Sequence, residues 1–536
     1  MIYTCLKNIA QNPPSDTYEV LQLIYVYFII SDCVDCFQVR SLASGLDRML
    51  YPYYKKDIES GKYTEDELDE LIAYFLTQWS SMDNYWGQPL YIGGTDVDGN
   101  TTVNPLSYKL IDIYDYIDIF NPKIQVKINN NTPEEFTEKV LSMIQKGKTS
   151  FVLMCEPGIY KAMRSLGVTH QEAVECDIKG CYEYSVKGKE VSTAPIHINL
   201  LKAIEFTLNR GKSLNDDVLR TFESKDTDNI STFDEFYDIY KSHIKYVIEQ
   251  TIDLAEEFEK YTAYGNPSPM YSATIESSLK SKKDAYAFGM KYNNSVVLMS
   301  GFASAIDSLC AIKYLIYDEK EITLTKFKDI LSSDWKDEEH IRCKVMKNPQ
   351  KFGNNQSFAD ALSKDLSEFV SGLINGKPNT RGGVWKAGMH SARKFIDLGQ
   401  MTSATPDGRR AGEEISKNAS PVIGMDKSGI SSLINSVLCM KPSLYTEDFC
   451  LDVMLHPSAV SGREGMEALK SVVKTYMLND GISLHFNIFD AEILKDAQLH
   501  PENYKNLQVR VCGWNVLWNN MCKEEQDAYI LRAENI

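Results

Sequence analysis

The sequence has little positive charge for its size and no long apolar run. Its 57 Lys and Arg residues face 74 Asp and Glu residues over 536 positions, which gives a net charge of −17. Proteins that bind a phosphate backbone concentrate Lys and Arg, so we expect no nucleic-acid partner. The most apolar stretch, residues 20–30, is too short to cross a bilayer and follows no basic segment. We therefore expect a buried helix or strand there, and no membrane partner.

Cysteine is sparse and scattered. The twelve cysteines are spread over the whole chain without a signal peptide, which is typical of reduced thiols in a cytoplasmic protein. The tightest pair, Cys33 and Cys36, has CxxC spacing, but no second pair of this kind and no suitably spaced His pair accompanies it. We therefore expect no bound metal.

No Pro-rich or Gly-rich linker and no repeat divides the chain. With 43% hydrophobic residues, it can bury one large core or two ordinary ones. The pattern is a mixture of helix and strand. Thr64-x-x-Glu67 and Thr169-x-x-Glu172 are capping boxes that open helices, and residues 196–208 and 213–260 are predicted to be helical.

Two short motifs contain the candidate catalytic residues. The first is Arg510-Val511-Cys512-Gly513-Trp514, followed by Gln526, Ile530 and Arg532, and the second, far upstream, is Lys179-Gly180-Cys181-Tyr182-Glu183. A lone Gly before an aromatic residue is usually an ordinary turn. Glycine is also the residue that best lets a backbone carbon radical flatten, because it has no side chain and tolerates unusual backbone geometry. A thiol can exchange hydrogen with such a radical, and a nearby carboxylate can move protons.

Together the two motifs resemble those of the glycyl radical enzymes, the superfamily of pyruvate formate-lyase, in its Glu-bearing eliminase and dehydratase branch. The resemblance spans roughly residues 42–536 and includes three further segments, at residues 404–412, 420–421 and 485–501. It implies that Gly513 stores a protein-derived radical. It also implies that Cys181 relays the radical to the substrate as a thiyl radical, and that Glu183 acts as general base or acid.

The resemblance implies an α/β fold, a ten-stranded barrel of two antiparallel five-stranded halves surrounded by helices. Two loops, bearing Cys181 and Gly513, would meet at its centre. We divide the chain into a pyruvate formate-lyase-like barrel domain over residues 1–400, with the Cys loop, and a C-terminal glycine radical domain over residues 401–536. Members of the family carry a largely helical region before the segment at residues 50–54, so we expect an N-terminally short barrel. It would be a truncated product or fragment, or be completed by another polypeptide.

The implied activity is that of an anaerobic lyase or dehydratase. It would eliminate across a C-O, C-N, C-S or C-C bond of a small polar substrate, as do the diol dehydratases, isethionate lyase and hydroxyproline dehydratase of this branch. Pyruvate formate-lyase-type members use adjacent cysteines, so Cys181-Tyr182-Glu183 disfavours acyl transfer, which stays as one alternative. A non-catalytic fragment or partner subunit is the other.

The resemblance also implies partners. A separate activating enzyme would hold the iron-sulfur cluster and cleave S-adenosylmethionine, because this chain lacks the clustered cysteine motif for that step. We expect a homodimer.

The candidate substrate contacts are Arg40, Ser41, Tyr91 and His197. Diol dehydratases have a histidine where Arg40 precedes Ser41 in this sequence. Arginine can fork onto a carboxylate or sulfonate, which favours an anionic substrate, and a structural salt bridge is the alternative. Tyr91 and His197 stand in segments, residues 87–91 and 195–197, that look like loops lining a pocket.

Overall fold

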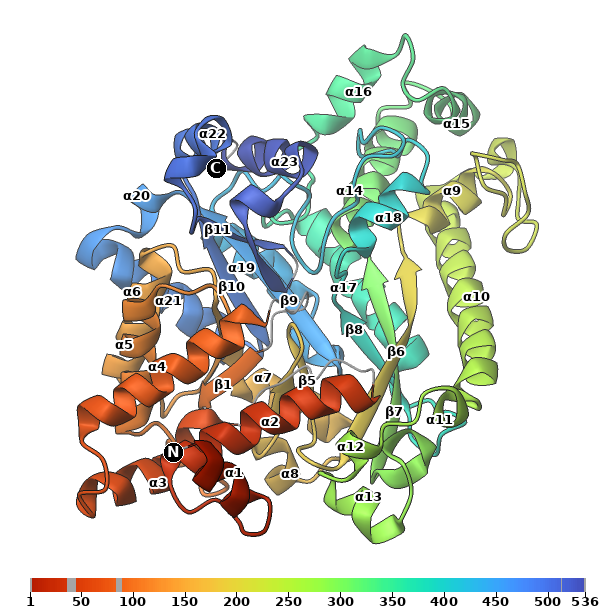
Figure 1. The fold of residues 1–536 in the computed structure, drawn as a ribbon. Helices are drawn as coiled ribbons and strands as arrows, with labels where there is room; N and C mark the ends of the chain where they lie inside the picture. Colours follow the sequence, from red (N-terminus) through yellow and green to blue (C-terminus); the bar gives the residue numbers. More distant parts are fainter. Residues whose placement is uncertain (1, 36–44, 83–88, 512, 535–536) are drawn as a thin grey trace. The chain divides into compact units, whose positions relative to one another are not determined.

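The computed structural model describes residues 2–35, 45–82, 89–511 and 513–534 (Figure 1). The chain divides into two compact units. Unit 1 comprises Met1–Val191, Tyr261–Asn293 and Val453–Ile536. Unit 2 comprises Ser192–Lys260 and Asn294–Asp452. Each core therefore draws on segments that lie far apart in the sequence.

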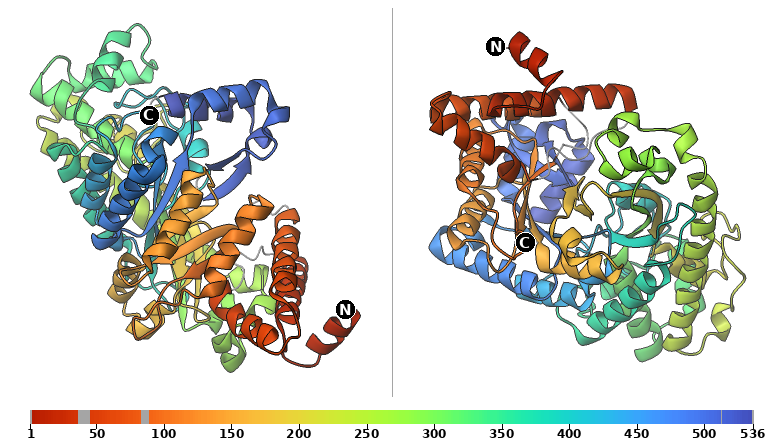
Figure 2. Two further views of the ribbon diagram at one scale, coloured as in Figure 1. Left: turned by 90° about the vertical axis from the view of Figure 1, so that its left-hand side faces the viewer. Right: turned by 90° about the horizontal axis from the view of Figure 1, so that it is seen from below.

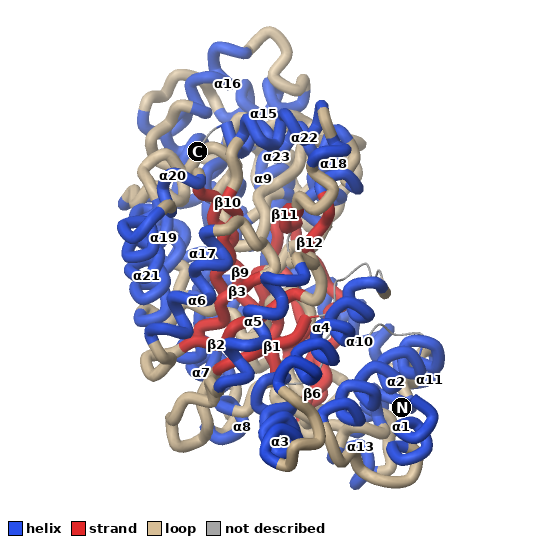
Figure 3. Tube along the Cα trace, turned by 60° about the vertical axis from the view of Figure 1, so that its left-hand side comes forward, coloured by secondary structure: helices blue, strands red, loops and turns tan. Residues whose placement is uncertain are grey.

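Unit 1 is built on four strands in the hydrogen-bonded order β1, β2, β3, β10 (Figure 3). Strands β1, β2 and β3 run parallel, and β10 is antiparallel to β3. Every residue of β2 and β3 is buried, as expected for strands that are covered on both faces. The bounds are β1 Pro89–Gly93, β2 Lys123–Ile128, β3 Phe151–Cys155 and β10 Ser483–Ile488.

Helices cover this sheet: α3 packs on β1, α7 packs on β3, and α6 packs on both β3 and β10. The α-helices of unit 1 are α1 Ile2–Ile9, α2 Thr17–Asp35, α3 Leu46–Glu59, α4 Glu65–Ser81, α5 Pro105–Ile117, α6 Glu134–Gln145, α7 Glu156–Ser165, α8 His170–Val174, α11 Thr262–Gly265, α12 Pro269–Ser272, α13 Glu276–Ser281, α20 Pro457–Val460, α21 Gly462–Leu478, α22 Ala491–Leu499 and α23 Lys523–Glu534. Its short π or 3-10 turns are η2 Ala285–Gly289, η5 Pro501–Asn503 and η6 Trp518–Asn520.

Unit 2 holds most of four further strands, in the order β9, β8, β7, β6, with β7, β8 and β9 parallel. The bounds are β6 Glu190–Asn199, β7 Tyr292–Ser300, β8 Trp385–Met389 and β9 Asp448–Leu455. The 27-residue helix α10, yellow-green in Figures 1 and 2, packs on α9 and α17. The helices of unit 2 are α9 Lys202–Leu208, η1 Thr227–Asn229, α10 Phe233–Glu259, α14 Phe302–Ile312, η3 Lys313–Asp318, α15 Leu324–Ser332, α16 Glu339–Met346, α17 Ser357–Ile374, α18 Lys394–Gln400, α19 Ile430–Cys439 and η4 Pro442–Leu444.

The helix starts predicted from capping residues are confirmed. In α4, the Glu67 amide donates to Thr64 Oγ1 at 3.3 Å, and the Thr64 amide donates back to Glu67 Oε2 at 2.8 Å. In α8, the Glu172 amide donates to Thr169 Oγ1 at 3.3 Å. Each cap satisfies an amide at the helix start that has no partner within the helix.

Two helix predictions need correction. Residues 196–199 belong to strand β6, and the helix begins only at Lys202. Ile196 and Ile198 alternate along β6 with the less buried His197 and Asn199, which is the two-residue period of a strand. Residues 213–232 form loops and the short turn η1, and the long helix starts after its N-cap Thr232.

The apolar stretch at residues 20–30 lies in helix α2 and is only partly buried. Val20, Leu21 and Phe28 are buried, whereas Leu23 and Ile30 are exposed. Among the described residues, α2 is the one helix long and apolar enough to cross a membrane, with 33% of its apolar window buried. A helix of this kind is weak evidence for a membrane span, because core helices and signal sequences share its length and composition.

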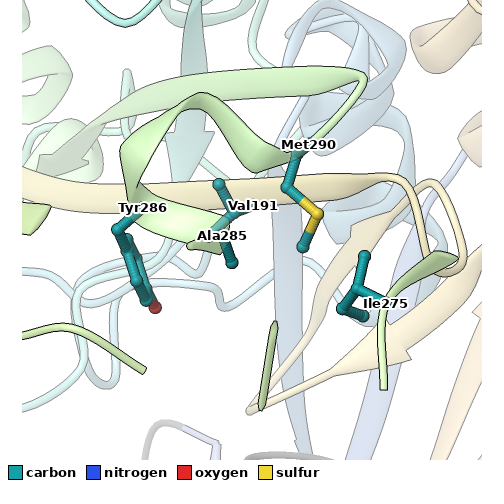
Figure 4. Close-up of a cluster of buried hydrophobic side chains, with 5 residues drawn as sticks. All are labelled: Val191, Ile275, Ala285, Tyr286 and Met290. Atoms are coloured by element: carbon teal, nitrogen blue, oxygen red, sulfur yellow. The ribbon is translucent and has the colours of Figure 1, made fainter. Parts of the chain in front are cut away.

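A small apolar cluster joins residues 261–293 to the start of β6 within unit 1. Figure 4 shows its five buried side chains, and Tyr271 packs against them while half-buried. Burial of this much apolar surface holds an otherwise irregular segment in place. The five residues are Val191, Ile275, Ala285, Tyr286 and Met290.

The predicted α/β fold class is confirmed: each unit combines a sheet of mostly parallel strands with surrounding helices. The finer prediction, a closed barrel of ten strands in two halves, stays a prediction. The described residues give four strands of the main sheets to each unit.

Candidate active site

Two short hairpins of unit 1 carry the predicted catalytic residues. The first pairs β4, Asp177–Lys179, with β5, Glu183–Ser185, and the turn between them contains Cys181. The second pairs β11, Gln508–Val511, with β12, Trp514–Leu517, and Gly513 lies in its two-residue turn. A hairpin turn places its residues at the tip of a hydrogen-bonded ribbon, where they can reach another part of the fold.

The structure brings Gly513 against Cys181. A methyl carbon placed on Gly513 would collide with Cys181 Cβ, would lie 2.5 Å from Cys181 Sγ, and would lie 3.3 Å from the ring of Tyr182. The φ angle of Gly513 is +109°, which side chains rarely allow. Both the space and the backbone conformation therefore require glycine, and the thiol occupies the space next to its α-carbon.

Glu183 folds back over the turn that bears Cys181. Its Oε2 accepts the amides of Cys181 at 2.5 Å and Tyr182 at 2.9 Å. Gly180, at φ +59°, makes room for this, because a methyl carbon there would lie 2.6 Å from Glu183 Oε2. The carboxylate is thereby held two residues from the thiol.

Two polar side chains of strand β2 donate hydrogen bonds to the backbone of the two turns. Lys123 Nζ donates to the carbonyl oxygens of Gly513 at 2.7 Å and Gly180 at 3.1 Å. Gln125 Nε2 donates to the carbonyl oxygen of Cys181 at 3.0 Å. Both side chains are fully buried. Their role was not predicted from the sequence, because the alternating polar residues of β2 are typical of a strand with one face in solvent.

An arm of the glycine-bearing hairpin also contacts the turn that bears Cys181. Arg510 Nε donates to the hydroxyl of Tyr182 at 3.2 Å, and its guanidinium lies 5.1 Å from the centre of the Tyr182 ring. Both side chains are fully buried. Asn515 Nδ2 donates to Ser150 Oγ at 2.7 Å, and Tyr529 Oη donates to the carbonyl oxygen of Arg510 at 2.5 Å. The glycine-bearing hairpin is thus fastened along its strands.

Of the predicted substrate contacts, Tyr91 lies in strand β1 and His197 in strand β6. Arg40 and Ser41 lie outside the described residues, as does Cys36 of the CxxC pair. Tyr91 is buried in β1 and donates its hydroxyl to Asp177 Oδ1 at 3.1 Å. Burial, together with the nearby Asp177 carboxylate, raises the pKa of Tyr91 well above its ordinary value, so the phenol stays protonated.

His197 lies in β6, in unit 2. Its Nδ1 is buried without a hydrogen-bond partner among the described residues. Burial, together with the positive charges of His390 and Lys394, lowers the pKa of His197 to about 4. The imidazole is therefore neutral at physiological pH. Its role as a substrate contact stays a prediction.

The segment at residues 404–412 has a structural role in unit 2. The guanidinium of the largely buried Arg409 donates to four backbone carbonyls and ties the loop to the end of helix α18. The acceptors are the carbonyl oxygens of Gly399, Thr402, Ser403 and Glu413. A planar group with five donors suits this fan of acceptors.

Comparison with known families assigns the two parts of the chain. Residues 1–399 match the family described as Pyruvate formate lyase-like, and residues 415–519 match the one described as Glycine radical. The chain belongs to the pyruvate formate lyase-like family. The second match indicates a protein-derived glycyl radical as the cofactor of this family member, and it includes Gly513. The position of Gly513 fits such a group, since glycine is required there and a thiol lies beside its α-carbon.

Relatives of this family member are named as dehydratases. It is 28% identical to trans-4-hydroxy-L-proline dehydratase of Clostridioides difficile over 91% of this chain and 64% of that protein. It is 28% identical to (2S)-3-sulfopropanediol dehydratase of Klebsiella oxytoca over 98% of this chain and 66% of that protein. The chain thus spans slightly under two thirds of the length of these relatives.

A solved structure of the family shares the fold. The crystal structure of Clostridioides difficile hydroxyproline dehydratase with trans-4-hydroxy-L-proline bound superposes with a TM-score of 0.92 at 26% identity. The match covers 99% of this chain and 69% of that one. The roles of Cys181, Glu183 and Gly513 themselves stay predictions.

Proposed function

We propose that this chain is the radical-bearing polypeptide of a glycyl radical lyase or dehydratase of the Glu-bearing branch. It would eliminate across a C-O, C-N, C-S or C-C bond of a small polar molecule. The observation that carries the proposal is the approach of Cys181 Sγ to the α-carbon of Gly513, at a position where only glycine fits. A carboxylate held on the same turn, that of Glu183, adds the proton-transfer group that an elimination needs.

The three residues divide the chemistry. The glycyl radical supplies a stored unpaired electron. Cys181 gives its S-H hydrogen atom to Gly513 and takes a hydrogen atom from a substrate carbon, and both transfers are reversed at the end of the cycle. Glu183 takes or gives the proton that accompanies departure of the neighbouring leaving group. The short turn that joins Cys181 to Glu183 keeps both groups at one end of the substrate.

The substrate class that we favour is a small hydroxy, amino or sulfonic acid. The two relatives above are named for a hydroxylated amino acid and a sulfonated diol, and both molecules carry an anionic group. Arg40, beside Ser41, would fork onto this anion. Tyr91 and the neutral His197 stay our further candidates for substrate contacts.

We extend the proposal to architecture and partners. The fold would be a ten-stranded barrel of two antiparallel five-stranded halves, with a barrel domain over residues 1–400 and a glycine radical domain over residues 401–536. A separate activating enzyme with an iron-sulfur cluster and S-adenosylmethionine would generate the radical. The active form would be a cytoplasmic homodimer.

Two alternatives remain distinct from this proposal. Acyl transfer of the pyruvate formate-lyase type is disfavoured because Tyr182 stands where a second cysteine would be needed. A non-catalytic fragment or partner subunit would keep the two hairpins but not turn over substrate. It is favoured if the chain is found only in a stable complex with another polypeptide.

Exposure to oxygen tests the radical assignment directly. A backbone carbon radical reacts with dioxygen and breaks the chain, so protein that is activated anaerobically and then aerated should lose the segment that begins near Gly513. Mass spectrometry measures the cleavage site, and electron paramagnetic resonance measures the radical beforehand. Gly513→Ala, treated in the same way, should show neither signal nor cleavage. An intact wild-type chain after a verified radical signal would remove Gly513 as the storage site.

A further inference from the structure

Lys123 joins the two hairpin turns and has no part in the chemistry proposed above. It begins β2 and is fully buried, and its ammonium donates to one backbone carbonyl on each of the two hairpin turns. Burying an ammonium group is costly unless hydrogen bonds replace its lost water. The fold therefore places a costly cation where it links Gly513 to the residue that precedes Cys181.

We propose that Lys123 is the positioning residue for hydrogen transfer between Gly513 and Cys181. The inference rests on the proposed function, and it assigns Lys123 a geometric role in it. One ammonium group holds the Gly513 carbonyl at 2.7 Å and the Gly180 carbonyl at 3.1 Å. The Gly513 carbonyl is bonded to the reacting α-carbon, and the Gly180 carbonyl is bonded to the nitrogen of Cys181. The pair of hydrogen bonds therefore fixes how closely the α-carbon and the thiol approach.

The hydrogen bond from Lys123 to the Gly513 carbonyl also stabilises a radical on the α-carbon of Gly513. A radical on the α-carbon of Gly513 is stabilised when the amide nitrogen donates electron density and the carbonyl withdraws it. A cation on the carbonyl oxygen strengthens that withdrawal. Lys123 thus favours the unpaired electron on Gly513 over the sulfur of Cys181. Loss of this stabilisation alone would speed transfer to Cys181, so slower exchange in a Lys123 variant reports lost alignment. In the exchange an S-H bond breaks and a C-H bond forms, or the reverse, and one hydrogen atom moves with no electron or proton left over.

Strand β2 offers a matched control four residues further on. Lys127 is also buried and lies on the same face of the strand, but its ammonium pairs with Glu156 Oε1 at 3.2 Å. It also donates to the carbonyl oxygens of Val174 at 3.2 Å and Cys176 at 3.3 Å, which precede the turn that bears Cys181. Removing Lys127 and Glu156 together removes a buried lysine without leaving a buried carboxylate unpaired.

The experiment follows hydrogen exchange without needing a substrate. The full chain is activated anaerobically in D2O by an activating enzyme of the family, and electron paramagnetic resonance records the splitting from the α-hydrogen of Gly513. The radical takes deuterium from the exchanged thiol of Cys181, and deuterium remains on the α-carbon whenever the original hydrogen is the atom then removed. Repeated transfers therefore collapse the splitting. Lys123→Met should acquire the radical but lose the splitting about 100-fold more slowly, the scale of a misplacement near 1 Å. Lys123→Gln keeps a neutral hydrogen-bond donor, so its rate of splitting loss should lie between those of the wild type and Lys123→Met.

Three results decide the proposal. A collapse rate in Lys123→Met equal to that of the wild type would overturn it, as would an equal slowing in the double variant Lys127→Met/Glu156→Gln. If Lys123→Met does not fold, Lys123→Gln takes its place, and an unchanged rate there overturns the proposal in the same way. A wild-type chain that never acquires a radical would instead remove the proposed function itself, so the two failures are distinguishable.

Discussion

The two hairpins that meet at Cys181 and Gly513 are fixed in different ways. The cysteine turn is held at its tip: Glu183 accepts two of its amides, and Gln125 donates to the carbonyl of Cys181. The glycine hairpin is held along its arms, through Arg510 and Asn515. At its tip, the hydrogen bond to the carbonyl of Gly513 comes from Lys123.

This difference suits the different tasks that we propose for the two turns. A thiol that must reach one particular C-H bond of a substrate needs a rigid turn, and internal hydrogen bonds supply it. A glycine that a second enzyme must reach needs a tip that can be released while its arms stay ordered. One buried lysine that joins the tips would make that release a single, reversible event.

The largest effect is expected from removing the thiol of the cysteine turn. Cys181→Ser should still acquire the radical, because the activating enzyme acts on Gly513 directly, but it should turn over no substrate, since an O-H bond is too strong to yield its hydrogen to glycine. Radical content by electron paramagnetic resonance and product formation are measured on the same sample. Cys33→Ser, which removes an exposed thiol, is the control. Turnover by Cys181→Ser would mean that another thiol is the relay.

A second variant separates proton transfer from hydrogen transfer within the same turn. Glu183→Gln keeps an oxygen that can accept the amides of Cys181 and Tyr182, so the turn should hold its shape. Loss of general acid-base assistance should lower kcat about 100- to 10,000-fold. The α-hydrogen exchange of Gly513 in D2O should be unchanged, whereas Glu183→Ala should slow both. If kcat survives in Glu183→Gln, the carboxylate only shapes the turn.

The sequence predicted what depends on local pattern or on a recognisable motif. The helix starts at Thr64 and Thr169 follow from contacts three residues apart, and they were correct. The contact of Cys181 with Gly513 joins distant parts of the chain, so only the family resemblance could bring them together. The strand at residues 196–199 was missed because its two-residue period is short and runs into a helix. Lys123 was missed because a lysine in a strand is usually at the surface, and only the tertiary structure shows it to be buried.

The smallest effect should come from loosening the arms of the glycine hairpin. Tyr182→Phe keeps the ring beneath the guanidinium of Arg510 but removes the hydroxyl that accepts its Nε-H at 3.2 Å. Because Arg510 is fully buried, the free energy of unfolding should fall by about 1–3 kcal/mol.

The matched control for this variant lies in unit 2. Tyr240→Phe also removes one fully buried hydroxyl, which donates to the carbonyl of Leu200 at 3.2 Å, far from either hairpin in the sequence. Denaturant unfolding should report a comparable loss for both variants. The α-hydrogen exchange of Gly513 should slow a few-fold in Tyr182→Phe and stay at the wild-type rate in Tyr240→Phe. Equal exchange rates in the two variants would show that the arms carry stability alone, which would leave the alignment of Gly513 with Cys181 to the tip contact of Lys123.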